Sequence, residues 1–296
     1  MSEDESDLDR ILALARAQRP DPAGWSLAVT VDWIERSYFG IGVSRRLDAL
    51  PSGELGACAS LRAPTPDDPV ATVTSMMRPG CEQLWTAQFG WIETRVEDAG
   101  AATVRAVSEC LTGDERLRWI DAGYQLVFEE LAMERRLSVA GGPHPRWPPD
   151  TSMLEWGPRA AAASFEVYES AFRTRPGFPA WSRSEWIERL TGDDAFLPQA
   201  SLCALRSGVP AGFVVCSKGW IDQVGVAPAH RRLGLASALV AEAMARMRAL
   251  GIEVARLHVN ANNPEALAAW HRLGFGECGR RGRFERGAHR AGQEAT

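Results

Sequence analysis

A short turn between an apolar strand and an amphipathic helix is the feature of this sequence that most constrains its fold. Residues 220–226 are typical of a buried strand, and residues 236–250 carry apolar side chains at helical spacing on one face. The turn between them reads Arg231-Arg232-Leu233-Gly234-Leu235-Ala236. A helix N-terminus leaves about four backbone N–H groups without internal partners and carries roughly half a positive charge. The sequence therefore predicts a turn that can hold an anion such as a pyrophosphate.

Small residues and arginines in this turn favour phosphate binding. Gly234 and Ala236 keep side-chain bulk away from the place where a phosphate would approach the backbone. Arg231 and Arg232 add positive charge and hydrogen-bond donors. Taken alone, the same residues also fit an ordinary strand-to-helix turn with solvated arginines, so the motif needs support from elsewhere in the chain.

A second motif follows downstream and gives that support. A strand expected over residues 253–260 leads into Asn262-Asn263-Pro264-Glu265-Ala266, a short helix and the segment Trp270 to Phe275. The order and spacing of the two motifs resemble the GNAT acyltransferase family over residues 153–285. In this sequence the first motif is carried by Val226, Pro228, Arg231, Gly234, Ala236 and Leu239, and the second by Leu257, Val259, Asn263, Ala266, Leu273, Gly274 and Phe275.

The pattern after residue 150 predicts the strand and helix order of a GNAT domain. A first strand is expected over residues 153–156, and helices over 159–173 and 181–191, the second beginning at Ser182 or Ser184. Strands over 201–206 and 211–217 form a hairpin through residues 207–210 and lead to the strand at Trp220. The expected order is thus strand, two helices, three antiparallel strands, helix, strand, helix and strand.

An internal repeat divides the 296-residue chain in two. Gly251, Arg256, Trp270, Gly274 and Phe275 are matched 151 positions earlier by Gly100, Arg105, Trp119, Gly123 and Tyr124. These matches indicate a tandem duplication, and the alternative is that they arose by chance. If the chain is duplicated, residues 102–108 form the equivalent strand, and residues 86–99 and 115–122 form the equivalent helices. The predicted fold class is α/β (α+β): two tandem GNAT folds, each a mixed, mostly antiparallel sheet flanked by helices. This arrangement is similar to that of mycothiol synthases, which acetylate a cysteinyl pseudo-disaccharide.

The first copy lacks the anion-binding turn. The chain there reads Gly80-Cys81-Glu82-Gln83-Leu84-Trp85, with a glutamate that would repel a pyrophosphate and a tryptophan that would crowd it. We expect a degenerate GNAT-like domain over residues 1–138, a linker rich in proline and glycine over 139–150, and a catalytic N-acetyltransferase domain over 151–296.

The resemblance implies a site for acetyl-CoA or another acyl-CoA in the second copy. Main-chain groups of Val224 and Val226 would pair with the pantetheine in a slot where two strands splay apart near Gly225, and the Val226 N–H would support the thioester oxygen. The implied cofactor-binding residues are Val224, Gly225, Val226, Arg231, Arg232, Leu233, Gly234, Leu235, Ala236, Ser237, Asn263, Ala266 and Trp270. Asn263 fits equally well as the N-cap of a helix, and Glu265 fits the first turn of that helix.

Asp222 is the candidate catalytic residue, because an alkylamine is almost wholly protonated at neutral pH and must lose a proton before it attacks. The alternative is that Asp222 binds a cationic amine without proton transfer. Many family members carry a tyrosine acid at position 270, but this chain has Trp270, whose indole N–H cannot supply a proton. Another group or a water would then protonate the leaving thiolate.

Other residues of reactive or aromatic type have simpler interpretations. His230 and His258 fit surface or loop positions, His271 should point away from position 270, and Cys216 fits a buried hairpin thiol better than a nucleophile. Seven aromatic residues could shape an acceptor pocket or simply pack in the core: Trp156, Tyr168, Phe172, Phe178, Trp181, Trp186 and Trp220.

Composition indicates a soluble, bacterial-style enzyme of the cytoplasm. The net charge is −5, no apolar run approaches the roughly 20 residues of a membrane span, and the start Met1 to Asp7 is acidic where a signal peptide would be basic. The six cysteines lack CxxC spacing, so no metal site or disulfide framework is expected. Lys218 is the only lysine, which favours a high-GC genome. The basic run Arg280 to Arg290 fits a solvated tail better than a nucleic-acid contact.

Three functions remain open at this point. The first is an acyl-CoA-dependent N-acyltransferase that acts on a primary amine of a small molecule by direct transfer in a ternary complex, as a monomer or homodimer. The second is a pseudoenzyme that binds CoA to regulate, which the missing tyrosine and degenerate first copy would suit. The third is a protein N-acetyltransferase, which would need an open, extended groove.

Overall fold

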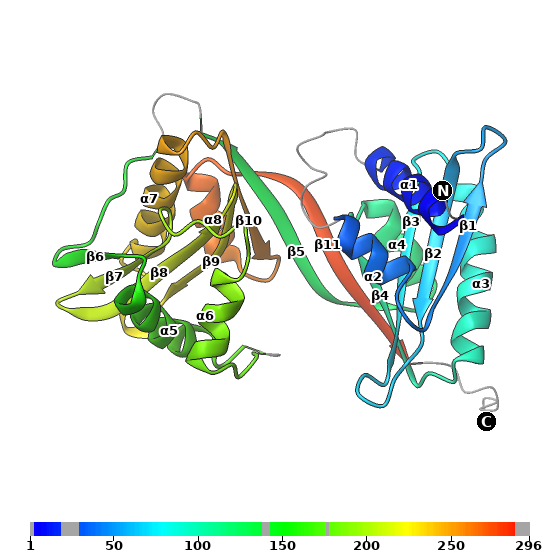
Figure 1. Ribbon diagram of the computed structural model, residues 1–296, viewed down its shortest axis with the longest axis horizontal. Helices are drawn as coiled ribbons and strands as arrows, with labels where there is room; N and C mark the ends of the chain where they lie inside the picture. The colour runs from blue at the N-terminus through cyan, green and yellow to red at the C-terminus, as the bar shows by residue number, and fades with distance from the viewer. Residues whose placement is uncertain (1–2, 19–29, 138–142, 176–177, 288–296) are drawn as a thin grey trace. The chain divides into compact units, whose positions relative to one another are not determined.

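The computed structural model describes residues 3–18, 30–137, 143–175 and 178–287 (Figure 1). The chain forms two compact units: unit 1 is Met1–Leu131 with Cys278–Thr296, and unit 2 is Ala132–Glu277. This division differs from the expected one at the C-terminal end, because residues from Cys278 on fall in unit 1. The expected linker over 139–150 lies within unit 2, and residues 139–142 of it are outside the described residues.

Unit 1 contains a mixed sheet in the order β1-β2-β3-β4-β11-β5. Its pairs β1/β2, β2/β3 and β4/β11 are antiparallel, and β3/β4 is parallel. The elements are α1 (Glu3–Ala17), α2 (Val31–Tyr38), β1 (Val43–Ala49), β2 (Leu55–Arg62), β3 (Val70–Met77), η2 (Glu82–Leu84), α3 (Trp85–Asp98), β4 (Thr103–Ser108), α4 (Gly113–Asp121), β5 (Gln125–Arg136) and β11 (Gly276–Gly287).

Both faces of this sheet are covered by helices (Figure 1). Cys58 packs with residues of α1 and α2, whereas its neighbour Ala59 packs with residues of α3. Successive side chains of a strand point to opposite faces, so these helices lie on opposite sides. The last strand belongs to the same core, because Phe284 of β11 is fully buried beside Trp119, with ring centroids 6.3 Å apart. This burial explains why the C-terminal strand groups with unit 1.

Unit 2 contains the sheet order β5-β10-β9-β8-β7-β6. Strands β6 to β9 are antiparallel neighbours, and β9/β10 is parallel. Its elements are the C-terminal part of β5, then β6 (Thr151–Glu155), α5 (Pro158–Phe172), α6 (Arg183–Thr191), β7 (Leu202–Arg206), β8 (Val209–Ser217), β9 (Trp220–Val226), η3 (Pro228–His230), α7 (Leu235–Ala249), β10 (Val254–Asn260) and α8 (Pro264–Arg272).

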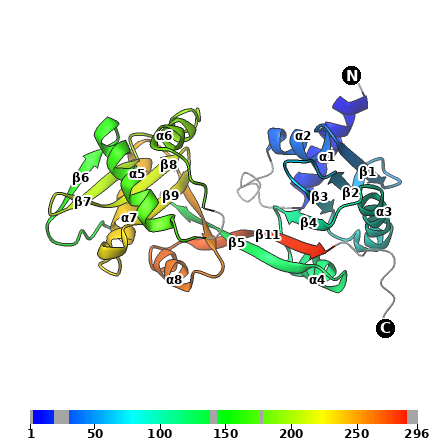
Figure 2. The same cartoon turned by 90° about the horizontal axis from the view of Figure 1, so that it is seen from below.

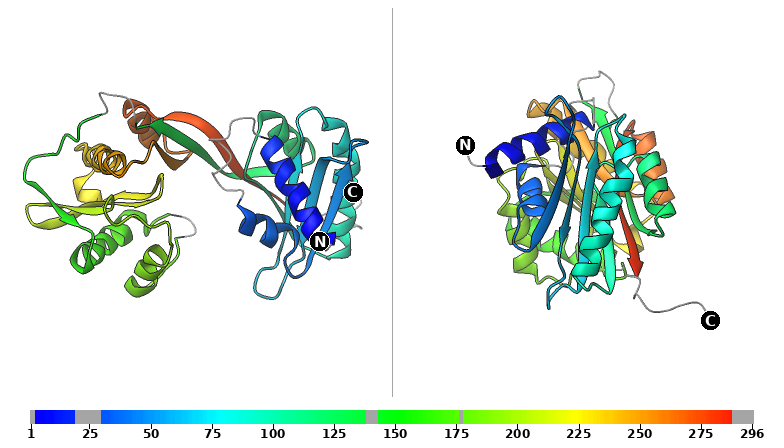
Figure 3. Two further views of the ribbon diagram at one scale, coloured as in Figure 1. Left: turned by 45° about the horizontal axis from the view of Figure 1, so that its top comes forward. Right: turned by 90° about the vertical axis from the view of Figure 1, so that its right-hand side faces the viewer.

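Helices α5 and α7 cover opposite faces of the unit 2 sheet, and α5 lies across β8 and β9 (Figure 2). A Cβ on Gly212 would approach Leu235 and Leu239 of α7, while the next residue, Phe213, contacts Phe172 and Trp186 on the other side. The left view of Figure 3 shows this layering, with the green helices below the yellow strands and an orange helix above.

The 151-residue repeat extends to hydrogen-bonding geometry. β4 and β10 begin at Thr103 and Val254, α4 and α8 at Gly113 and Pro264, and β5 and β11 at Gln125 and Gly276, each pair 151 residues apart. Both helices end at a glycine with φ near +80°, Gly123 and Gly274. After this glycine, Tyr124 N donates to Trp119 O and Phe275 N donates to Trp270 O, each at a distance of 3.0 Å. The two copies therefore share their local structure as well as their sequence spacing.

The elements expected for the second copy are confirmed, with boundaries shifted by at most two residues. Ser182 is the N-cap of α6 and forms a capping box with Glu185. β8 begins at Val209, two residues before the expected start, because the hairpin turns tightly at Ser207 and Gly208, which have φ values of 49° and 81°. Pro210 is accommodated at a bulge, where the β7/β8 register shifts.

Two general features complete the fold. No helix in the described ranges has the length and apolar character needed to cross a membrane. The same ranges contain no group of three or more His, Cys, Asp or Glu residues placed to hold a metal ion.

Candidate active site of unit 2

The two parallel strands at the centre of unit 2 separate along their length. β9 and β10 pair at Trp220 with Arg256 and at Ile221 with Leu257, and each strand then continues without further paired residues between them. Gln223 lies opposite Val215, and Ile221 opposite Cys216, so Asp222 is the extra residue of a β-bulge. The opening therefore starts at Asp222, earlier than the expected position near Gly225.

Backbone groups of Val224 and Val226 point toward this opening. Ala227 N donates to Ala211 O on the β8 side over 2.9 Å. Because backbone groups alternate between the two edges of a strand, Gly225 also points toward β8, whereas Val224 and Val226 point away from it. The Val226 carbonyl accordingly accepts a hydrogen bond from Arg231 Nε, over 3.3 Å, and not from β8.

Gly225 is required by packing. A Cβ at this position would lie 2.5 Å from Phe213 Cε1, and real Cβ atoms do not approach a ring carbon so closely. Phe213 is itself fully buried between Phe172 and Trp186. The glycine thus lets the middle of β9 lie flat against the aromatic core of unit 2.

The turn before α7 presents an uncapped helix N-terminus at the end of β9. Gly234 is the N-cap with φ of +83°, and no side chain caps the helix there. The first i→i−4 bond runs from Ala238 N to Gly234 O, so the N–H groups of residues 235–237 lie before the helical ladder. A Cβ at Gly234 would meet nothing within 4 Å, so the space before these N–H groups is open.

The two arginines of the turn have different surroundings. Arg231 Nη2 donates to Ala171 O over 3.1 Å, and its Nε donates to Val226 O, so its guanidinium fastens the turn to the end of α5. Arg232 has a left-handed φ of 62° and is exposed, and in the described part of the chain no carboxylate forms an ion pair with it. Arg232 is therefore the arginine better placed to meet an external anion.

Asn263 caps α8, as one of its two interpretations predicts. Its Oδ1 accepts from Ala266 N over 3.1 Å, and Glu265 lies exposed in the first helical turn. Trp270 of the same helix is only 5% exposed. A buried indole cannot release a proton, so the structure places no side-chain acid at this position.

Asp222 has the electrostatic character of a base that works near neutral pH. Desolvation by the surrounding protein raises its pKa to about 6, although part of the carboxylate remains exposed. The hydroxyl of Ser217 donates to Asp222 Oδ1 over 3.0 Å and lowers the pKa, whereas the negative charge of Asp193 raises it. Sequence reasoning missed Ser217 and Asp193, because only the bulge and the neighbouring loop bring them beside Asp222.

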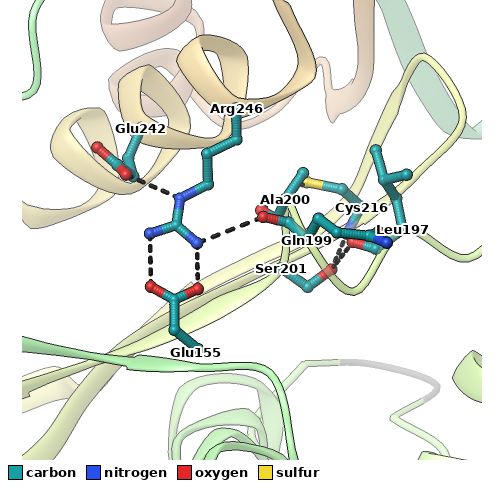
Figure 4. A network of polar contacts seen from close by, with 8 residues as sticks. All are labelled: Glu155, Leu197, Gln199, Ala200, Ser201, Cys216, Glu242 and Arg246. Atoms are coloured by element: carbon teal, nitrogen blue, oxygen red, sulfur yellow. Dashed lines mark hydrogen bonds and ion pairs between the residues drawn. The ribbon is translucent and has the colours of Figure 1, made fainter. Parts of the chain in front are cut away.

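A partly exposed polar network joins α7 to β6 and to the segment before β7 (Figure 4). Arg246 donates from Nη2 to Glu155 Oε1 of β6 over 2.9 Å, from Nε to Glu242 Oε1 over 2.8 Å, and from Nη1 to Gln199 O over 3.3 Å. The ion pair also lowers the pKa of Glu155. These bonds fix the helix whose N-terminus faces the opening.

Cys216 belongs to the same region and is not a nucleophile. Its N–H donates to Ser201 Oγ over 3.0 Å and its thiol to Ala200 O over 3.5 Å (Figure 4). Burial raises the pKa of this thiol well above its ordinary value. Because a thiolate is needed for attack, the buried-thiol interpretation is the one that the structure favours.

The aromatic residues considered for an acceptor pocket mostly form core. Trp186 is fully buried and donates from Nε1 to Gln223 Oε1 over 3.3 Å, while Trp220 stacks on His258 with centroids 5.0 Å apart. The others pack in one cluster around Phe165 and Phe213: Trp156, Tyr168, Phe172, Phe178 and Trp181. Gln223 of β9, which the sequence analysis did not identify, is the polar residue that contacts this cluster through Trp186.

The equivalent turn of unit 1 holds a carboxylate of its own chain. Glu82 Oε1 accepts from Gly80 N over 3.0 Å, and backbone hydrogen bonds lower its pKa. Trp85 stacks on Phe89 with centroids 5.4 Å apart and fills the position of Ala236. A negative side chain thus lies where the second copy has an open turn.

The two units and the open strand pair define a tandem GNAT fold. Residues 164–275 match the model of the acetyltransferase (GNAT) family. This region of the chain is thus similar to a GNAT acetyltransferase domain, and the fold of the chain is similar to that of a tandem GNAT protein. Members of this family are in general N-acetyltransferases that use an acyl-CoA co-substrate.

Solved structures agree with this fold. A GCN5-related N-acetyltransferase from Sphaerobacter thermophilus is 24% identical, with a TM-score of 0.68, and the match covers 95% of this chain and 91% of that one. A tandem GNAT protein from the clavulanic acid biosynthesis pathway is 15% identical, with a TM-score of 0.60 and coverage of 98% and 97%. A GNAT acetyltransferase from Colwellia psychrerythraea is 14% identical, with a TM-score of 0.56 and coverage of 94% and 96%. No curated protein matches the chain significantly.

Proposed function

We propose that unit 2 is an acyl-CoA-dependent N-acyltransferase, with acetyl-CoA as donor, that acts on a primary amine of a small molecule. The observation that carries this proposal is the opening between β9 and β10, which runs from Asp222 to an uncapped helix N-terminus at Gly234. The cofactor-binding roles given to the turn, to Asn263 and Ala266, and to the backbone of β9 are part of the proposal. The degenerate character of unit 1 is part of it as well.

The residues of the site fit an acyl-CoA. The N–H groups of residues 235–237 and the exposed Arg232 would bind the pyrophosphate. The backbone of Val224 and Val226 points into the opening and would hold the pantetheine amides as an added strand would. When bound, the thioester supplies an activated acyl carbon, and the Val226 N–H would support the charge that develops on its oxygen.

Asp222 would remove the proton of the acceptor amine, directly or through a water. With a pKa of about 6, its carboxylate is ionised at neutral pH and close enough to that pH to accept a proton. The amine then attacks the thioester carbon, the C–S bond breaks, and the thiolate leaves. Because Trp270 is buried and cannot donate a proton, a water would protonate the thiolate.

Amine-dependent release of free thiol from acetyl-CoA tests the proposal, together with calorimetric binding of acetyl-CoA. We expect the wild type to bind acetyl-CoA and to release thiol with at least one of a panel of amino sugars, amino acids and alkylamines. Binding without release by any amine or N-terminal peptide would favour a CoA-binding regulator, the function that Trp270 would suit. Release with peptides alone would favour a protein N-acetyltransferase. Absence of acetyl-CoA binding would contradict the proposal.

A further inference from the structure

Unit 1 contains a pocket of about 140 Å³ at the counterpart of the proposed acyl-CoA site. Five residues that line it lie 151 positions before residues assigned to cofactor binding in unit 2. They are Ser75, Glu82, Trp85, Thr112 and Glu115, and their counterparts are Val226, Leu233, Ala236, Asn263 and Ala266. Thr112 even keeps the capping role of Asn263, since its hydroxyl accepts from Glu115 N over 3.1 Å. The pocket is thus what the duplicated cleft has become in unit 1.

These substitutions remove the features that suit a nucleotide. Glu82 already accepts the hydrogen bond of Gly80 N, so its carboxylate occupies the turn. Trp85 packs between Phe89 and Trp119, with centroids 5.4 Å and 5.0 Å away. The remaining space corresponds to only a few molecules of water. A phosphate-bearing ligand is therefore disfavoured by both charge and size.

The chemistry of the pocket favours a small cation. Three acidic residues line it, Glu82, Asp114 and Glu115, against one basic residue, Arg118. The Arg118 guanidinium lies over the Trp85 ring, 5.6 Å from the centroid, and the walls are completed by apolar groups of Met77 and Pro79. When all three acids are ionised, the lining carries a net negative charge beside an apolar surface. An ammonium head with a short hydrocarbon body matches both parts.

Glu115 is the group that makes this a built site. Glu115 lines the pocket and is only 8% exposed, so more than nine-tenths of this acidic residue is buried. Ser108 Oγ donates to Glu115 Oε2 over 2.9 Å, and Trp119 Nε1 donates to Oε1 over 3.4 Å. These bonds hold the carboxyl in one orientation. The counterpart in unit 2 is Ala266, so the acid is a feature of unit 1 alone.

We propose that this pocket of unit 1 binds a small primary ammonium compound, with the carboxylate of Glu115 as its main partner. The site is separate from the acyl transfer assigned to unit 2 and does not depend on it.

Binding of a cation would change the protonation of Glu115. Burial raises the pKa of this carboxyl to about 7, so at about pH 6 most of the group is protonated. A neighbouring ammonium stabilises the carboxylate, and the proton of Glu115 passes to the buffer. Above about pH 8 the group is already ionised and no proton is released. Binding heats in two buffers of different ionisation enthalpy would therefore differ at the lower pH and agree at the higher one.

Calorimetric titration of the full chain with ethylammonium chloride tests the proposal. We expect binding by the wild type, proton release at about pH 6, and a dissociation constant raised roughly tenfold or more in Glu115→Gln, the loss of one charge-assisted contact. The matched control is Glu97→Gln, which removes the same charge from an exposed position on α3 of the same unit and should bind as the wild type does.

Two further variants separate this site from the amine site proposed near Asp222. Asp222→Asn should leave ethylammonium binding to unit 1 unchanged. Asp114→Asn, at an exposed position on the pocket rim, should weaken binding less than Glu115→Gln does and gives a second readout if that variant loses thermal stability. Binding that is lost in Asp222→Asn but kept in Glu115→Gln would overturn the proposal, as would absence of wild-type binding. Tighter binding of propionate than of ethylammonium would show an anion site at Arg118 and would also overturn it.

Discussion

The two copies keep the same backbone at the C-terminal end of their short helices, where Gly123 and Gly274 have matching φ values, but their strand-to-helix turns differ in backbone and in charge. In unit 2 the turn ends at Gly234, with open space before an uncapped helix. In unit 1 the chain supplies its own anion, because Glu82 accepts from Gly80 N. The comparison teaches that a fold tolerates the loss of an anion site when a side chain of the same chain accepts a backbone N–H group of the turn.

The largest effect on turnover is expected at Asp222, the proposed general base of unit 2. Unit 1 has Ala71 at the equivalent position and so lacks this base. Asp222→Asn should lower kcat by about a hundredfold with little change in acetyl-CoA binding, since a positioned general base contributes roughly 10²–10⁴-fold. The value of kcat is measured from the initial rate of thiol release with the amine that gives the fastest wild-type reaction. Unchanged turnover would leave Asp222 with the binding role that was its alternative.

The pH dependence of the rate follows from the same group. A base acts in its ionised form, so the rate should rise as the pH increases through about 6, the pKa of Asp222. Asp193→Asn removes a charge that raises this pKa, so the acidic limb of the profile should move to lower pH. A profile that stays in place would mean that Asp222 does not control it.

The open turn is tested by Gly234→Glu, which gives unit 2 the kind of carboxylate that unit 1 has. Repulsion of the pyrophosphate and strain at φ of +83° should raise the acetyl-CoA dissociation constant roughly tenfold or more, as measured by calorimetry. Gly251→Glu is the matched control: its φ is +81°, a Cβ there also meets nothing within 4 Å, and it follows the other end of α7. Equal binding by the two variants would remove the turn from the cofactor site.

The buried acid of unit 1 should make stability depend on pH. Burial raises the pKa of Glu115 to about 7, so between the ordinary glutamate pKa and 7 the native state binds more protons than the unfolded state. The contribution of this group to stability is therefore present at low pH and is lost as the pH rises toward 7. Glu115→Gln, which stays neutral, should be more stable than the wild type at pH 8 by an amount on the order of 1–2 kcal/mol.

Thermal unfolding of Glu115→Gln at several pH values measures this difference, and Glu97→Gln controls for the lost charge. The gain of the variant should shrink as the pH falls from about 7 and should be smallest below about pH 4, where the wild-type side chain is protonated in both states. A constant difference at every pH would mean that the substitution changes packing and not ionisation.

Much of unit 2 could be predicted from sequence, because its signals are local. Ser182 starts α6, and the apolar spacing after Gly234 marks α7. The environment of Asp222 could not be predicted, since the bulge in β9 and the loop at Asp193 depend on register between distant segments.

Unit 1 was harder to predict from its sequence, for a related reason. Strands β1, β2 and β3 lack a motif that would identify them. The final strand β11 pairs with β4, as Arg283 with Val107, although 176 residues separate the two in sequence. A periodic pattern in the sequence does not reveal such a long-range pairing. The sequence therefore placed β11 in the domain expected over residues 151–296, whereas the structure groups most of it with unit 1.

The smallest effect, and the sharpest test of the comparison, is the reverse exchange in unit 1. The double variant Glu82→Leu with Trp85→Ala gives unit 1 the leucine and alanine that unit 2 has at the equivalent positions 233 and 236. It also frees the Gly80 N–H. We expect weak binding of inorganic pyrophosphate at a second site, at least tenfold weaker than acetyl-CoA binding in unit 2, because the arginines of the turn are still missing. The titration is done in the Gly234→Glu background, so that unit 2 does not contribute, and the Glu82→Leu single variant shows how much Trp85 blocks. If the double variant binds no pyrophosphate, the turn of unit 1 has lost the anion site through its backbone, and the bound carboxylate of Glu82 is a consequence of that loss and not its cause.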